Sequence, residues 1–304
     1  MTGPHTATAT QRKLPPIPVI IRVIFGRIKR RLQYAYHRAF FLPGVIKQKR
    51  KKDVLKIAFL ALTPGMWKYD EIFQLMRKDP RFDPVIIPID NPDATDEENR
   101  ARVCELTGFF ASNNLGPFVG HEDPRQLYEN LQRTRADMVF LCQPYPSTFS
   151  LTYRQIRKLG ILIGYLPYSF GTTAFKWGYN NPAQNFAWIN FYPTQSHRQD
   201  ARRLTSVGDK NVRVVGYPNP KDSMRKTPDF KQHWKLGDPA LKRVIWATHY
   251  SVLPQSALLF STFLELCDTM PALAKKYAGK IQFAFKPHPL LEEKLHKIWG
   301  VQRT

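Results

Sequence analysis

The sequence has few cysteines, few acidic residues and no long apolar run. Cys104, Cys142 and Cys267 lie far apart without a CxxC pair, which excludes a disulfide framework and a four-cysteine zinc site. The apolar run at residues 17–25 is interrupted by Arg22, and a bilayer span needs roughly 20 apolar residues. Hydrophobic residues still make up 43% of the 304, so we expect a folded protein rather than a disordered one.

Several catalytic signatures are also missing. Without a GxGxxG motif, no dinucleotide cofactor is expected, and without GxxxxGK there is no Walker-type phosphate loop. No GxSxG sequence is present to form a serine nucleophile elbow. No HxxxH or HExxH spacing occurs, so we expect no bound metal and no cofactor of any kind.

The charge is strongly basic and unevenly distributed. There are 46 Lys and Arg against 24 Asp and Glu, and the first 52 residues hold 13 of the basic residues and no acidic one. Such an excess favours polyanionic partners. We expect a basic amphipathic helix over residues 19–42 and a polybasic tail over residues 47–52. The aromatic residues expected at a lipid boundary are Phe25, Tyr34, Tyr36, Phe40 and Phe41.

Docking of residues 1–52 on an anionic membrane surface, through residues 19–52, is therefore our leading interpretation of this segment. The alternatives are a solvated tail and a nucleic-acid-binding segment. No zinc-finger or RNA-binding signature accompanies the charge, so nucleic acid is not the expected partner. Arginines follow the apolar run instead of preceding it, which argues against a signal peptide.

Short apolar runs alternate with helical stretches from Val54 onward, which is typical of βα units on a parallel sheet. They predict a nearly complete doubly wound α/β domain over residues 53–215. Strands are expected at 54–62, 83–89, 137–142, 161–166, 186–192 and 212–215. Helices are expected at 68–78, 97–110, 124–134 and 148–159.

A second, smaller region follows a Pro-, Lys- and Asp-rich linker at residues 216–240. Residues 241–304 are few for an ordinary domain of roughly 100 or more residues, so we expect a partial α/β domain with an uncovered sheet face. Its expected elements are a strand at 243–250, one long helix at 258–277, a strand at 281–286 and a short helix from Leu290.

Two turns of the first domain can form a site, because ligands of open parallel sheets bind beyond the carboxyl ends of the strands. The first strand is followed by Trp67, Lys68 and Asp70, where a helix start can face an anion. The fourth strand is followed by Tyr168 and Ser169, whose hydroxyls can bind a polyhydroxyl or phosphate group. The alternative is ordinary turn chemistry, with Trp67 in the core.

Two histidines are expected to emerge at one sheet edge of the second region. A lysine and two histidines there can neutralise a diphosphate leaving group and donate a proton to it. Two prolines flank one histidine and fix its backbone direction. A purely structural role for the histidines is the alternative. The residues concerned are Thr248, His249, Ser251, Lys286 and His288.

Four blocks of the sequence occur in an order found in known enzymes. They are residues 67–70 with 81–84, residues 191–204 leading into 214–218, residues 245–251 followed by 260–264, and residues 281–290. Together they resemble the CDP-glycerol glycerophosphotransferase family, and within it the bacterial capsular and surface-polysaccharide branch. The resemblance covers roughly residues 54–300.

The resemblance implies a GT-B architecture of two Rossmann-like domains, with the donor bound mainly by the second. It implies transfer of glycerol phosphate, or a similar polyol phosphate, from a CDP-alcohol to a lipid-linked or polymeric acceptor of teichoic-acid or capsule synthesis. The expected location is the cytoplasmic face of the bacterial membrane, as a peripheral protein.

Residue by residue, His288 in the KPHP sequence matches the family's histidine near the donor phosphates. His249 and Ser251 match the block before it, while Asp70 belongs to the acceptor side with Tyr168 and Ser169. The resemblance and the strand-end chemistry together favour His288, His249 and Asp70 as catalytic residues. Classical members carry a catalytic histidine in a His-Gly-Thr-Pro setting, where this sequence reads Tyr-Ser-Phe-Gly-Thr.

The family continues beyond residue 300 to an Asp- and Ser-rich block that holds donor phosphates, so we expect an incomplete donor domain. Two other functions fit the sequence. One is a GT-B glycosyltransferase that uses a nucleotide sugar in cell-envelope polysaccharide synthesis, and the other is a noncatalytic membrane-docking remnant. Release of CMP or of a nucleoside diphosphate distinguishes the two enzymes.

Overall fold

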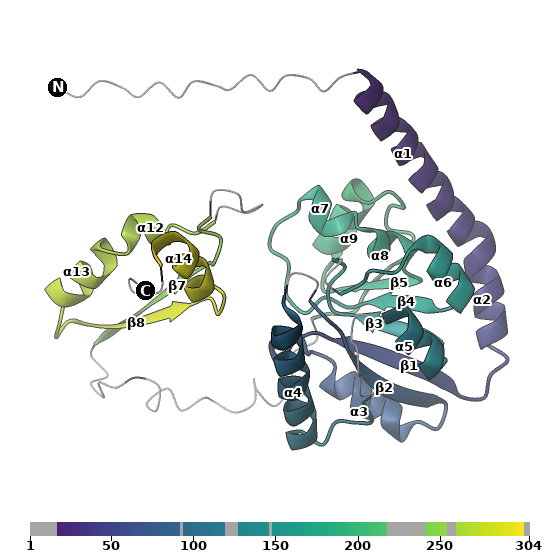
Figure 1. The fold of residues 1–304 in the computed structure, drawn as a ribbon, viewed down its shortest axis with the longest axis horizontal. Helices are drawn as coiled ribbons and strands as arrows, with labels where there is room; N and C mark the ends of the chain where they lie inside the picture. Colours follow the sequence, from purple (N-terminus) through teal and green to yellow (C-terminus); the bar gives the residue numbers. More distant parts are fainter. Residues whose placement is uncertain are drawn as a thin grey trace. The chain divides into compact units, whose positions relative to one another are not determined.

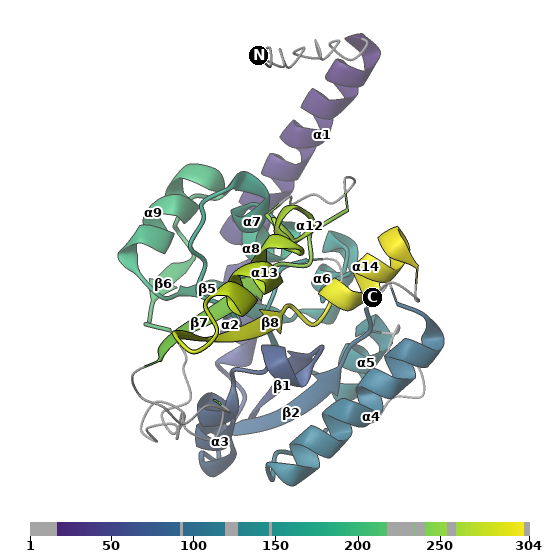
Figure 2. The same cartoon turned by 90° about the vertical axis from the view of Figure 1, so that its left-hand side faces the viewer.

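The computed structural model describes residues 17–91, 94–118, 127–145, 148–217, 234, 241–253 and 260–300 (Figures 1 and 2). The chain divides into two compact units, which we call unit 1, Met1–Arg225, and unit 2, Lys226–Thr304. Most of the expected linker at 216–240 lies outside the described residues.

Unit 1 is built on a six-stranded sheet in the order β2-β1-β3-β4-β5-β6. Every neighbouring pair is parallel, which confirms the doubly wound α/β fold. All six strands overlap the ranges that the sequence predicts. They are β1 (Leu55–Ala61), β2 (Phe82–Pro88), β3 (Met138–Leu141), β4 (Leu162–Tyr165), β5 (Ile189–Tyr192) and β6 (Val212–Val214).

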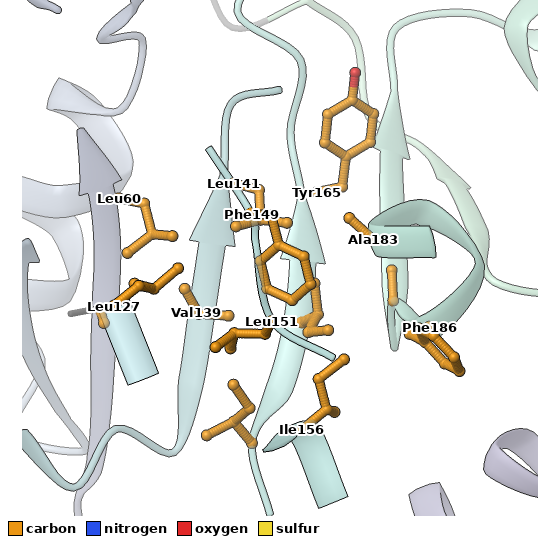
Figure 3. Packing of buried hydrophobic residues seen from close by; sticks show 14 of the residues in the cluster. Leu60, Leu127, Val139, Leu141, Phe149, Leu151, Ile156, Tyr165, Ala183 and Phe186 are labelled. Carbon is orange, nitrogen blue, oxygen red and sulfur yellow. The ribbon is translucent and has the colours of Figure 1, made fainter. Parts of the chain in front are cut away.

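Both faces of this sheet are covered, because side chains of a strand alternate between its two faces. In β1, Ile57 and Phe59 belong to one buried cluster, while Ala58 and Leu60 belong to the other. The Phe59 cluster packs on α2 (Leu42–Lys49), α3 (Asp70–Lys78) and α4 (Asp96–Ser112). The Leu60 cluster, shown in Figure 3, packs on α5 (Leu127–Thr134), α6 (Tyr153–Leu159) and α8 (Pro182–Phe186).

Three helical segments of unit 1 differ from the sequence prediction. The strand expected from residue 186 begins at Ile189, because Pro182 starts α8 with Asn181 as its N-cap. Two further helices, α7 (Lys176–Tyr179) and α9 (Gln195–Leu204), were not predicted.

The basic segment at the start of the described chain is a helix that is longer than predicted and partly buried. It runs through α1 (Ile17–Tyr36), a π-helical turn η1 (His37–Phe41) and α2. The Tyr34 ring is buried at 4.7 Å from the Phe186 ring, and Phe41 packs against both core clusters. The expectation that these two residues face lipid is therefore wrong, whereas Phe25, Tyr36 and Phe40 are exposed.

The polybasic stretch at residues 47–52 is likewise not a free tail. Lys49 and Lys52 each place Nζ 2.6 Å from Oδ1 of Asp137, which directly precedes β3. The Asp137 side chain is 3% exposed. Two of the basic residues therefore neutralise a buried carboxylate and hold the end of α2 against the sheet.

Unit 2 contains a parallel pair of strands, β7 (Lys242–Thr248) and β8 (Ile281–Pro287). The long helix expected at 258–277 is replaced, within the described residues, by α12 (Phe263–Leu266) and α13 (Thr269–Lys276). Pro271 has no N–H to continue a helix through this point, so it occupies the first turn of a new one. The chain then forms β8 and α14 (Leu291–Trp299).

The core of unit 2 is small. Val252, Phe263, Leu291 and Leu295 form its buried cluster. Ile245 in β7 is 58% exposed and Phe285 in β8 is 47% exposed.

Candidate functional site

The strand-end histidines of unit 2 lie side by side because β7 and β8 end in register. Thr248 pairs with Pro287 in the last rung of the ladder, so His249 and His288 are the next residues on the two strands. The backbone N–H of His288 donates to the carbonyl of Thr248 at 3.0 Å, which extends the pairing by one bond. The centroids of the two imidazole rings are 5.6 Å apart.

Local hydrogen bonds orient both rings and select a tautomer. Nδ1 of His249 accepts the backbone N–H of Ser251 at 3.2 Å, and Nδ1 of His288 accepts that of Leu290 at 3.1 Å. An acceptor nitrogen carries no proton, so each neutral ring bears its proton on Nε2. The pair thus offers two Nε2–H groups that can donate to a ligand.

Burial favours the neutral form of both rings, and charge repulsion adds to this effect at His288. Burial lowers the pKa of His249. Burial also lowers the pKa of His288, and the neighbouring charge of protonated His249 lowers it further. An arriving phosphate opposes both effects, because a negative charge stabilises an imidazolium.

The remaining predicted residues of unit 2 surround this pair. Ser251 is 1% exposed, and its Oγ lies 2.8 Å from Nδ1 of His249 and accepts the backbone N–H of Phe260 at 3.0 Å. Oγ1 of Thr248 is buried and has no hydrogen-bond partner among the described residues. Lys286 is exposed and pairs in register with Ala247. The structure therefore brings the five predicted residues of this unit to one strand edge.

In unit 1, the turn after β1 lies at the point where the strand order reverses, between β1 and β3. Trp67 is buried among aromatic rings, including Phe110 at 4.9 Å, and its indole N–H donates to Oδ1 of Asp70 at 2.7 Å. The Trp67 ring is thus a core residue that positions Asp70. Asp70 itself is the first residue of α3, where the helix dipole favours a carboxylate. Lys68 is half-buried beside it.

The turn after β4 is tied to this region. The hydroxyl of Tyr69 donates to the carbonyl of Leu166 at 3.3 Å, two residues before Tyr168. Tyr168 packs against the core and its carbonyl accepts the hydroxyl of Tyr217 at 2.8 Å. Ser169 is exposed. The two predicted turns of unit 1 therefore meet, with the Ser169 side chain at the surface.

Two polar residues at the same edge were missed by the sequence analysis. Gln143 follows β3 and is 5% exposed. His197, in the first turn of α9, is 6% exposed, and its Nδ1 lies 2.7 Å from Oγ1 of the N-cap residue Thr194. Its ring centroid lies 4.9 Å from that of Phe170 in the turn after β4. The Thr-x-x-His sequence directly after a strand was the available signal for His197.

In the described part of the chain, no group of three or more His, Cys, Asp or Glu side chains is arranged to hold a metal ion.

Neither a protein-family model nor a curated protein sequence matches the chain. Among solved structures, UDP-N-acetylglucosamine 2-epimerase from Rickettsia bellii superposes with a TM-score of 0.52 and 14% identity, over 83% of this chain and 67% of the epimerase. For UDP-GlcNAc 2-epimerase from Neisseria meningitidis, bound to UDP-GlcNAc, the TM-score is 0.49 and the sequence identity is 14%, over 80% of this chain and 69% of the epimerase. For a glycosyltransferase from Rickettsia africae, the TM-score is 0.42 and the sequence identity is 10%, over 81% of this chain and 72% of the glycosyltransferase.

At such identities the likeness concerns the fold alone. The share of the chain matched by the Rickettsia bellii epimerase exceeds unit 1, so the match extends into unit 2. The chain is therefore a mostly parallel α/β protein with the GT-B type of fold.

Proposed function

We propose that this protein is a GT-B glycosyltransferase that binds a nucleotide sugar through its diphosphate at the edge of β7 and β8. The observation that carries the proposal is the pair of His249 and His288. Their ring centroids are 5.6 Å apart, and both rings carry the proton on Nε2, where it can be donated. Exposed Lys286 adds a positive charge on the same strand end. Such donors stabilise charge that develops on a leaving diphosphate.

The structural neighbours support this donor class over a CDP-alcohol. The Neisseria meningitidis structure contains UDP-GlcNAc, and the Rickettsia bellii enzyme is named for UDP-N-acetylglucosamine. The proposal transfers only the class, a nucleoside diphosphate bearing a sugar.

An acceptor hydroxyl oxygen attacks the anomeric carbon of the sugar and forms a new C–O bond, while the bond between that carbon and the β-phosphate oxygen breaks. The electron pair leaves with the nucleoside diphosphate, whose charge the two Nε2–H groups and Lys286 stabilise. The hydroxyl proton passes to a general base on the acceptor side.

A second candidate is transfer of glycerol phosphate from CDP-glycerol, which the KPHP sequence around His288 favours. Here the acceptor oxygen attacks the β-phosphorus, the bond between the two phosphates breaks, and CMP leaves. The same donors would stabilise the departing phosphate.

The test is the identity of the released nucleotide. The full chain is incubated with UDP-sugars or CDP-glycerol and a bacterial membrane fraction as acceptor, and nucleotides are separated by chromatography. We expect a nucleoside diphosphate, lost in His288→Ala and retained in the control His296→Ala, whose histidine lies on α14.

Each other outcome argues against the proposal. CMP from CDP-glycerol supports the second candidate, and a UDP-sugar changed without nucleotide release indicates an epimerase. Turnover that is unaffected by His288→Ala removes the strand-end pair from the mechanism. No turnover with any donor favours a noncatalytic role.

A further inference from the structure

An exposed apolar stripe runs along α1. Seven large hydrophobic side chains are between 45% and 69% exposed at a spacing of three or four residues. At about 100° per residue, the six that lie within α1 fall within about 120° of its circumference. The seven residues are Ile21, Ile24, Phe25, Ile28, Leu32, Tyr36 and Phe40.

Basic residues border this stripe on both sides. By the same helical spacing, Arg22 and Lys29 lie along one edge, and Arg27 and Arg31 lie along the other. The first 52 residues contain no acidic side chain to pair with them. An apolar stripe between two rows of cations matches the layered chemistry of an anionic lipid surface.

The opposite side of the helix is occupied by protein. Tyr34 packs on Phe186, and Nε2 of His37 lies 2.9 Å from the Phe186 carbonyl oxygen. Further along, Lys49 and Lys52 bind Asp137. The helix is therefore held to unit 1 at its C-terminal end, and in Figures 1 and 2 its first turns project beyond the other helices of that unit.

A groove of about 530 Å³ continues the stripe between α1 and α6. Apolar side chains of Phe25, Ile28, Leu32 and Tyr36 line it, together with Tyr153 and Arg157 of α6. The Arg157 guanidinium lies 5.3 Å from the Tyr36 ring centre. An apolar lining beside a guanidinium suits contact with lipid acyl chains and a lipid phosphate.

We propose that α1 docks unit 1 on an anionic lipid bilayer, with the stripe in the boundary between headgroups and acyl chains and the arginines on the phosphates. No helix in the described residues has the length and hydropathy needed to span a membrane. A second copy of the chain is the weaker occupant, because apposed stripes would bring like-charged arginine rows together without acidic partners. This inference is independent of which donor the protein uses.

The test is co-flotation of the full chain with vesicles of phosphatidylcholine, with or without phosphatidylglycerol. We expect binding only to the anionic vesicles. Removing Arg27 and Arg31 as Arg27→Gln/Arg31→Gln should weaken it by about fivefold per charge, and raised salt should weaken it further. Phe25→Ser/Leu32→Ser should weaken it by at least about tenfold.

Leu75→Ser is the matched control, because Leu75 on α3 is 61% exposed but lies outside the stripe. It should bind like the wild type. Thermal melts establish that all variants remain folded. Equal binding to both vesicle types, or binding that survives Phe25→Ser/Leu32→Ser, overturns the proposal. Sedimentation velocity showing a dimer that this variant converts to monomer, without vesicle binding, assigns the stripe to a second copy instead.

Discussion

Replacing Asp137 should loosen the attachment of the N-terminal helix to unit 1. Its carboxylate, 3% exposed, accepts from Nζ of Lys49 and Lys52 and from the backbone N–H of Lys56 at 3.0 Å. Asp137→Asn keeps the shape and one acceptor oxygen but removes the charge between two ammonium groups. Breaking a buried pair costs about 3–5 kcal/mol, and the partial exposure of the lysines reduces this to about 2–4 kcal/mol.

The two lysines should contribute unequally. Lys49 is 14% exposed and Lys52 is 46% exposed, so solvent screens Lys52 more strongly. Lys49→Met should lower the free energy of unfolding by about 1–2 kcal/mol, and Lys52→Met should lower it by less than about 1 kcal/mol. In an Asp137→Asn background both costs should nearly vanish, because the shared partner is gone.

Hydrogen exchange of the β3 amides in the full chain measures the effect in unit 1 separately from unit 2. A loss of 2–4 kcal/mol corresponds to exchange about 30-fold to 900-fold faster in Asp137→Asn. Unchanged exchange in Asp137→Asn, or equal effects of the two lysine variants, would refute the reasoning.

The direction of the Asp137 pKa shift determines how the stability contributed by this carboxylate depends on pH. Burial opposes ionisation of Asp137, but hydrogen bonds from Lys49, Lys52 and Lys56 outweigh it and lower the pKa. A carboxylate with a folded-state pKa below its unfolded value of about 3.9 stabilises the fold above that pH, and the contribution disappears as the pH falls through the folded value. The difference between wild type and Asp137→Asn should therefore shrink below about pH 4.

Two further perturbations probe unit 1. Phe59 is fully buried and stacks at 4.9 Å on Phe140, so Phe59→Ala should cost about 3–5 kcal/mol in urea unfolding, and a cost below about 1 kcal/mol would contradict the packing. Burial is the main cause that lowers the pKa of His37 to about 4, so the unfolded chain binds the proton more readily. The free energy of unfolding of unit 1 should therefore fall by up to about 3 kcal/mol as the pH falls from 6.5 toward 4. His37→Gln should flatten this slope in urea midpoints, and an unchanged slope would assign it to other groups.

The strands were predictable because their signal is local. Each is a short apolar run bounded by Pro, Gly or Asn, and β7 and β8 were found in this way together with the six strands of unit 1. The helices α7 and α8, of four and five residues, are too short to show a period. In α9 only Ala201 and Leu204 are apolar, so its clearest signal is the Thr194 cap.

Contacts between distant parts of the chain were beyond the sequence. The amphipathic helix was predictable, but the burial of Tyr34 depends on Phe186, and the pairing of Lys49 depends on Asp137. By contrast, the proximity of His249 and His288 follows from the topology, because the neighbouring parallel strands β7 and β8 end at the same edge of their sheet. The backbone N–H donors of Ser251 and Leu290, which set the tautomer of the two rings, required coordinates.

The central claim is that His249 and His288 bind the diphosphate of a nucleotide donor, and titration calorimetry with UDP on the full chain tests it most directly. The account predicts that UDP binds more tightly than uridine. His249→Ala and His288→Ala should each lower the affinity for UDP by about tenfold or more, because a hydrogen bond to a charged group contributes about 1.5–3 kcal/mol. His296→Ala should leave the affinity unchanged. Equal affinities for UDP and uridine, or UDP affinity that neither strand-end variant alters, would contradict the account.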